Sequence, residues 1–395
     1  MEHLGELEKD GQMGALSNVR VIELAGMGPV PFCGMLLGDM GADVLRIDRL
    51  APTGDGIIMA ASADLRGRNK RSARIDLKHP RGRETLMSLV KSADILLEGY
   101  RPGVTERMGI GPEPCLEANP ALVYGRATGW GREGPMAMTA GHDINYLALT
   151  GALAMIGPPG GAPVPPLNLV GDLGGGALYL AFGVLCALNS AQATGKGQVV
   201  DSAMIDGIAS LLTVSHGRRQ FGQYIAERGQ NILDGGAPFY TTYATKDGKF
   251  VAVGAIEARF YKALIKTLGF DAEDLPQRDD RQNWPRLREI FADTFREKTR
   301  AEWENVFDGT DACVSPVLEL EEAGSHPHNI ERGMLVAREG VENPAPAPRL
   351  SGTPGALSRP PVEAGQHTAE ALADWGLDAD LISEGLEQGF LSGTS

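Results

Sequence analysis

A strand–helix–strand pattern near the amino terminus constrains the fold of this chain more than any other feature. Residues 19–24 (VRVIEL) form a short apolar run, residues 31–40 have the composition of a helix, and residues 42–48 (ADVLRID) form a second apolar run. This order predicts two parallel strands joined by a crossover helix. Apolar runs at 93–98 and 122–128 extend the pattern. We therefore predict the α/β class, with a doubly wound parallel (Rossmann-like) sheet.

The chain is too long for one simple core. Its 395 residues favour two domains, and a hairpin signal at 239–253 indicates a smaller α+β domain beside the large one. The predicted boundaries are 1–12 for a disordered leader, 13–206 for the large domain, 207–236 for a linker, 237–329 for the small domain, and 330–395 for a return to the large domain that ends in a polar tail.

Composition argues against several classes of partner. A net charge of −14 makes nucleic acid an unsuitable ligand, and the longest apolar run, 177–188, has the length of a core helix rather than of a membrane span. The four cysteines lack CxxC spacing, which indicates a reducing cytoplasm without a disulfide framework or a zinc site. His326 and His328 have the spacing of metal ligands, but no third ligand is nearby, so no metal is expected.

Two polar residues lie in similar settings at the heads of apolar runs. The run 144–153 reads as a helix that Asp143 can cap, so His142 is expected at the mouth of that helix. Asp172 precedes three glycines and a second apolar run, so the backbone N–H groups at 172–174 are expected to face an anion. Such a His and Asp could be a pair of proton-transfer groups. The local pattern also allows a second interpretation, an Asp that merely caps and a His in a turn.

The densest basic cluster is RGRNKR at residues 66–71, in an otherwise acidic chain. One interpretation is a solvated run of charges. The other is an anion site, because the cluster follows the second predicted strand and open α/β sheets bind ligands at the carboxyl ends of their strands. Arg49, directly after the acid that ends that strand, likewise suits a phosphate.

Several motifs, in order along the chain, resemble the class III CoA-transferase family, which also contains the α-methylacyl-CoA racemases. They are ELA at 23–25, GDMGADV at 38–44, DLK at 76–78, RPG at 101–103 and GKGQVVD at 195–201. Three more are similar to the racemase branch in particular: GHDINY at 141–146, GD at 171–172 and GAIE at 254–257. The resemblance extends from residue 15 to about residue 349, and it implies an interlocked homodimer of two-domain subunits.

The resemblance also implies a reaction, the interconversion of (R)- and (S)-2-methylacyl-CoA through an enolate. Its catalytic residues would be His142 and Asp172 on opposite sides of the α-carbon, with Glu257 as the partner of the histidine. Two bases are needed because the proton leaves one face and returns to the other. The N–H groups around Asp172 are a candidate site for the enolate oxygen. Acyl-CoA is then the substrate, and no cofactor or metal is implied.

CoA contacts follow from the same resemblance. The implied ligands are Arg49, Arg68, Lys70, Arg71, Leu77, Arg101, Arg107, Asp143 and Tyr146. Two alternatives stay open at this point. In a class III CoA-transferase, Asp172 would attack the thioester and form a mixed anhydride; in a CoA-binding protein without chemistry, neither base would act. His142 discriminates, because nucleophilic transfer needs no base on the opposite face.

Overall fold

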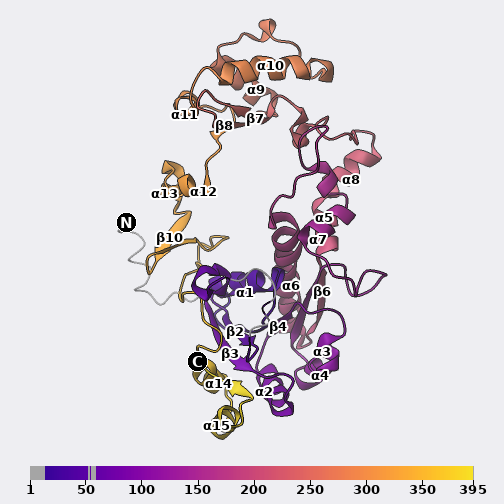
Figure 1. Cartoon of the computed structure of the whole chain (residues 1–395), viewed down its shortest axis with the longest axis vertical. Coiled ribbons are helices and arrows are strands. Elements are labelled where there is room, and N and C mark those ends of the chain that lie inside the picture. Colours follow the sequence, from indigo (N-terminus) through magenta and orange to yellow (C-terminus); the bar gives the residue numbers. More distant parts are fainter. Residues whose placement is uncertain (1–13, 52–53, 55–58, 395) are drawn as a thin grey trace. The chain divides into compact units, whose positions relative to one another are not determined.

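The computed structural model describes residues 14–51, 54 and 59–394, which divide into two units (Figure 1). The first unit contains the chain up to Thr150, Leu167–Leu211 and everything from Gly333 onward; the second contains Gly151–Pro166 and Leu212–Arg332. The predicted leader, 1–12, lies outside the described residues. The predicted large domain, 13–206, included the segment 151–166. In the structure this segment groups with the second unit instead.

The first unit is built on a seven-stranded sheet with the order β12-β3-β2-β1-β4-β5-β6. All neighbouring pairs are parallel except β12 with β3. The strand order reverses between β1 and β4, as in a doubly wound sheet, so the predicted fold class is confirmed. The strands are β1 (Arg20–Leu24), β2 (Asp43–Asp48), β3 (Lys70–Ile75), β4 (Ile95–Glu98), β5 (Val123–Thr128), β6 (Gln198–Ala203) and β12 (Leu391–Ser392).

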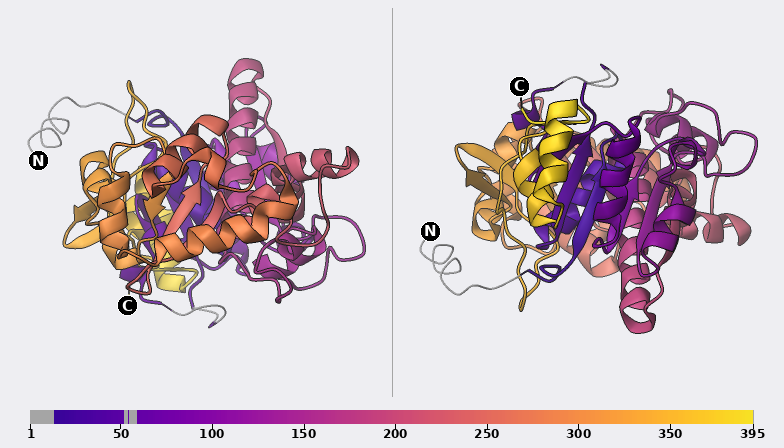
Figure 2. Two further views of the ribbon diagram at one scale, coloured as in Figure 1. Left: turned by 90° about the horizontal axis from the view of Figure 1, so that it is seen from above. Right: turned by 90° about the horizontal axis from the view of Figure 1, so that it is seen from below.

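Helices cover both faces of this sheet. Successive side chains of a buried strand point to opposite faces, so neighbouring residues of β1 pack in different cores. Ile22 of β1 packs in a core with α2 (Pro80–Val90) and α4 (Pro112–Ala118), whereas Val21 packs in a core with α1 (Pro29–Asp39) and α6 (Tyr179–Thr194). The first core also holds the carboxyl-terminal helices (Figure 2, right), which are α14 (Thr368–Asp374) and α15 (Ala379–Gln388). The predicted polar tail is therefore wrong, since it forms α15 and the edge strand β12.

Strand β3 is one of the elements that the sequence analysis missed, because its first two residues, Lys70 and Arg71, belong to the basic cluster. Lys70 is 1% exposed, and its Nζ donates to Glu23 Oε2 at 2.6 Å and to the Pro31 carbonyl at 2.8 Å. Burial raises the pKa of Glu23 and lowers that of Lys70, since both charges lose hydration. Gly34 lets helix α1 pack closely on this ion pair, because a Cβ there would lie 1.8 Å from Glu23 Oε2.

The central helix is longer than the predicted run 177–188. A π-helix, η5 (Leu169–Leu178), continues directly into α6. By length and composition alone the run Leu169–Thr194 could cross a membrane, although such a single helix is weak evidence. Its inward face packs in the second core of the sheet, while Phe182 is 69% exposed on the outward face.

The second unit contains a three-stranded antiparallel sheet, β7-β8-β9. Strands β7 (Tyr240–Ala244) and β8 (Phe250–Gly254) form the predicted hairpin, and β9 (Val314–Pro316) adds a strand that the sequence analysis did not identify. An aromatic-rich core joins this sheet to its helices. These helices are α9 (Ala258–Leu268), α10 (Trp284–Phe295) and α11 (Arg300–Phe307).

The buried ion pair between Glu23 and Lys70 leads to a prediction about stability. Glu23→Gln leaves Lys70 as an uncompensated buried charge, so the free energy of unfolding in urea should fall by about 3–5 kcal/mol. The control is Lys249→Met, which removes the partly exposed pair with Glu322 and should change little. Equal unfolding midpoints for Glu23→Gln and the wild-type protein would show that the pair does not hold β3 in place.

Candidate active site

The carboxyl ends of β1, β2 and β4 meet where the strand order reverses, which is where doubly wound sheets bind ligands. Tyr100, just after β4, donates its hydroxyl to the Ala25 carbonyl at 3.0 Å, just after β1. The guanidinium of Arg49, just after β2, lies over the Tyr100 ring at 5.7 Å from its centroid. Arg101 and Arg107 follow β4 and are exposed. Within the described residues, no carboxylate forms a salt bridge with any of these three arginines.

Three other predicted CoA ligands, Arg68, Lys70 and Arg71, form ion pairs within the protein. Arg68 is 3% exposed and holds Asp39 through Nε at 3.0 Å and Nη2 at 2.6 Å. Arg71 holds Asp43 at 2.7 Å and Asp374 at 2.6 Å. Together with Lys70 they stabilise the region of β3, so the structure argues against their assignment as phosphate ligands: their charges are already neutralised. Another predicted ligand, the half-buried Leu77, packs against the first core.

His142 lies at the position predicted for it. Helix α5 (Asp143–Leu149) begins directly after it, and the His142 backbone N–H donates to Asn145 Oδ1 at 3.0 Å. The imidazole is exposed at this end of the helix. Asp143, however, does not cap α5 as expected. It is 8% exposed, and its Oδ2 accepts the backbone N–H of Asp172 at 2.7 Å, so it joins the two candidate catalytic segments.

Asp172 lies in the first turn of η5 rather than before a helix. Its N–H is used by Asp143, and the N–H of Leu173 donates to the Asn168 carbonyl at 3.2 Å. The prediction that these two groups are free for an enolate oxygen is therefore wrong. Gly171 permits the arrangement, because a Cβ there would lie 2.4 Å from Asp143 Oδ2.

Opposing influences act on the pKa of the Asp172 carboxylate. Burial raises its pKa, and the like charge of Asp143 raises it further. Hydrogen bonding from the Asn168 side chain, His142 and Arg66 oppose this rise. Helices α5 and η5 pack together, so the structure brings His142 and Asp172 into one electrostatic environment. The sequence analysis missed Asn168 and singled out Arg66 only as part of the basic cluster, because no local pattern links either to Asp172.

Tyr146, another predicted CoA ligand, contacts Gly141 and Trp130. Its hydroxyl donates to the Gly141 carbonyl, and its ring meets Trp130 edge-on at 4.7 Å between centroids. Burial raises its pKa to about 12. The side chain therefore holds the loop before His142 in place, and its hydroxyl already has a partner.

Glu257 belongs to the second unit, where it is exposed and immediately precedes α9. Its pairing with His142 stays a prediction. In the same unit, His326 Nε2 lies 3.0 Å from Glu304 Oε1. Across residues 14–51, 54 and 59–394, no group of three or more potential metal ligands occurs.

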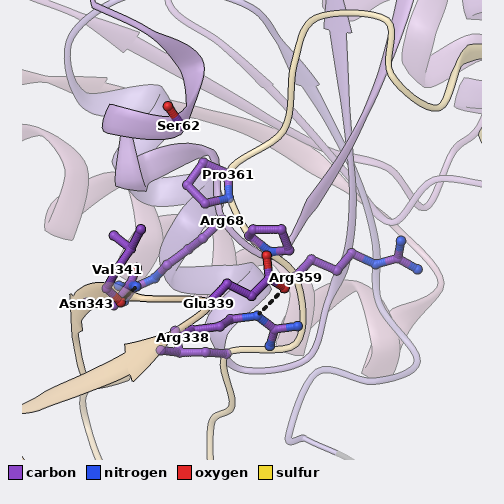
Figure 3. Close-up of a pocket in the computed structure, with 10 residues that line it drawn as sticks. Ser62, Arg68, Arg338, Glu339, Val341, Asn343, Arg359 and Pro361 are labelled. Atoms are coloured by element: carbon purple, nitrogen blue, oxygen red, sulfur yellow. Dashed lines mark hydrogen bonds and ion pairs between the residues drawn. The ribbon is translucent and has the colours of Figure 1, made fainter.

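A pocket of about 130 Å³ lies beside the hairpin of β10 (Leu335–Arg338) and β11 (Val341–Pro344) (Figure 3). Arg338 faces Glu339 there, and the guanidinium of Arg359 points away from the other labelled side chains. The pocket contains neither His142 nor Asp172, and we do not assign it to the active site. Its walls are Ser62, Arg68, Arg338, Glu339, Val341, Asn343, Leu357, Arg359, Pro360 and Pro361.

Comparison with known proteins identifies the family of this chain. Residues 16–368 match CoA-transferase family III, and the chain belongs to that family. The chain is 48% identical over 370 residues to alpha-methylacyl-CoA racemase of Mus musculus, covering 93% of this chain and 95% of that one. It is 47% identical over 371 residues to the Homo sapiens protein of the same name, with the same coverages. The resemblance to the racemase branch is thus confirmed.

A solved structure of the same kind supports the fold. The crystal structure of a CAIB/BAIF family protein from Brucella suis superimposes with a TM-score of 0.78, covering 92% of this chain and 100% of that one. Its sequence identity is 24%, so this likeness concerns the fold alone.

The Asp143–Asp172 contact makes a prediction that does not depend on any reaction. Asp143→Asn keeps an oxygen that can accept the Asp172 N–H but removes the like charge, so the pKa of Asp172 should fall. A carbon-13 NMR titration of labelled aspartate carboxylates measures it. Asp206→Asn, at an exposed acid, is the matched control and should leave that pKa unchanged. An unchanged Asp172 pKa in Asp143→Asn would show that the two carboxylates do not interact.

Proposed function

We propose that this protein is a racemase that interconverts the (R)- and (S)-thioesters of 2-methylacyl-CoA. The observation that carries the proposal is the packing of α5 against η5, which presents an imidazole and a carboxylate of raised pKa in one place. The names of the mouse and human relatives support the choice of substrate.

The proposed chemistry uses one base on each face of the α-carbon. One base takes the α-proton, and the electron pair of the C–H bond moves into the enolate of the thioester. The other base, already protonated, delivers its proton to the opposite face. Asp172 and His142 exchange roles when the opposite enantiomer reacts. We assign Glu257 as the group that orients His142, on the resemblance alone.

We place the phosphates of CoA at the three exposed arginines, Arg49, Arg101 and Arg107. Their position at the carboxyl ends of β2 and β4 supports this, because arginine's fork suits phosphate and ligands of such sheets bind there. The chemistry proposed above calls on no metal and no further cofactor.

We propose a homodimer, with the interlocked form implied by the resemblance. Exposed apolar side chains on each unit support contacts with a partner: Leu178 is 51% and Phe182 69% exposed in the first unit, and Phe221 is 82% exposed in the second. Sedimentation equilibrium tests the proposal. The expected cytoplasmic location also stays a proposal, and it is based on the cysteine spacing.

The two-base assignment is tested by solvent deuterium exchange on each resolved enantiomer. His142→Ala and Asp172→Ala should each lose racemisation by roughly 10²–10⁴-fold, because general acid–base groups typically contribute that much. Each variant should still exchange the α-proton of one enantiomer with retention, and the two variants should exchange opposite enantiomers.

Two outcomes would contradict this assignment. Exchange of the same enantiomer by both variants would indicate a single base. A requirement for a free acid acceptor, with hydroxylamine trapping an adduct at Asp172, would identify the transferase mechanism instead.

The CoA assignment is tested at Arg107. Arg107→Ala should mainly raise KM, since a phosphate contact far from the α-carbon binds ground and transition states alike. Steady-state kinetics measure this, with Arg296→Ala, at an exposed arginine of the second unit, as the control. A large fall in kcat at unchanged KM would show that Arg107 acts elsewhere.

A further inference from the structure

The connector between the two proposed bases belongs to the other unit. Helix α5, which follows His142, and π-helix η5, which carries Asp172, both lie in the first unit, whereas the intervening Gly151–Pro166 groups with the second. This segment is rich in Gly and Pro and contains one short 3₁₀ turn, Leu153–Met155. Hydrogen bonds within the segment hold part of it, such as that from the Val164 N–H to the Ile156 carbonyl at 3.0 Å, and contacts with other parts of the chain add to them.

The side chain of Arg228 supplies three of the contacts from outside the connector. Arg228 donates from Nη1 to the Ala154 carbonyl at 2.8 Å and from Nε to the Pro158 carbonyl at 3.1 Å. Its Nη2 donates to the Gly161 carbonyl. Three carbonyls from three parts of the connector thus converge on one planar guanidinium. A lysine ammonium, which is a compact point donor, cannot reproduce that fork.

The anchor is itself rigid. Asp234 accepts the backbone N–H of Gly229 at 2.9 Å and that of Asn231 at 3.0 Å, which fixes the turn that carries Arg228. The backbone of this turn packs tightly on the connector, because a Cβ at Gly229 would lie 2.3 Å from Pro159 Cγ. Arg228 therefore holds the connector to a turn of the same unit.

The connector ends next to Asp172. Leu167 has a φ of +56°, a conformation that L-residues adopt only when surrounding contacts enforce it. The next residue, Asn168, accepts the Leu173 N–H at 3.2 Å, a contact that spans Asp172. Along the chain, Leu167 lies between the connector and η5. Freedom in the connector would let Leu167 relax and would displace the chain that leads into Asp172.

We propose that Arg228 is a positioning residue for the reaction, which ties the Gly151–Pro166 connector down and thereby fixes the entry of the chain into η5 and the place of Asp172. His142 is less dependent on it, because His142 precedes α5 and is held by Asn145. The proposal rests on the catalytic roles proposed above for His142 and Asp172.

The test compares Arg228→Met, Arg228→Lys and the control Arg286→Met in the full chain. Arg286 belongs to the same unit and pairs with Glu289, both 66% exposed. Arg228→Met should lower kcat for racemisation roughly 10–10²-fold, as expected for a small misplacement of a reacting group, with KM changed less than about threefold. Arg228→Lys should be intermediate, and Arg286→Met should match the wild-type protein.

Two further readouts separate positioning from general loss of structure. Amide hydrogen exchange in Arg228→Met should accelerate at residues 151–173 and stay unchanged in β7 and β8. Deuterium incorporation should slow more for the enantiomer that Asp172 deprotonates than for the one that His142 deprotonates.

Unchanged amide exchange at 151–173, or equal slowing of both enantiomers, would overturn the proposal for Arg228. Normal racemisation by Asp172→Ala would instead overturn the catalytic role proposed for Asp172, while leaving the amide exchange result intact. The two failures are therefore distinguishable.

Discussion

The buried ion pair between Lys70 and Glu23 is the interaction on which the arrangement of the first unit depends. It joins β3 to β1 across β2, and its third partner, the Pro31 carbonyl, lies in the first turn of α1. Burying two charges is costly unless their geometry is good, so the pair strongly constrains where α1 can lie on the sheet. Helix α1 in turn packs against η5, where a Cβ at Gly176 would lie 3.0 Å from Pro29 Cβ. The pair therefore acts, through α1, on the helix that carries Asp172.

The elements that the sequence predicted well are those whose signal is local. Strand β1, helix α1 and strand β2 follow from apolar periodicity, and the hairpin of β7 and β8 follows from its turn residues. Strand β3 was missed for the opposite reason. Its charges look like a solvated run or an anion site, and the acids that neutralise them belong to other elements of the fold. Tertiary pairing of this kind has no signature within a short window, so pattern and composition could not reveal it.

The distinction between local signals and tertiary contacts also applies to the candidate site. The place of His142 before a helix was predictable from its neighbours, whereas the link from Asp143 to the Asp172 amide spans 29 residues and was not. The local pattern left open whether His142 and Asp172 do chemistry at all, and only the family resemblance favoured a pair of bases. The π-helix η5, which precedes α6, was also not predictable from the local pattern. Such irregular turns are frequent at functional sites, and here it begins beside the connector that Arg228 holds.

Asp143 also bears on how a carboxylate can act as a base toward carbon. An ordinary aspartate is too weakly basic to take a proton readily from a thioester α-carbon, so a raised pKa helps. Burial and the like charge of Asp143 both raise the Asp172 pKa, and the repulsion from Asp143 disappears when Asp172 accepts the α-proton. Hydrogen bonding from Asn168 and the charges of His142 and Arg66 act in the other direction. The site thus combines burial and an acidic neighbour, which favour protonation of Asp172 during the reaction, with groups that favour its charged form.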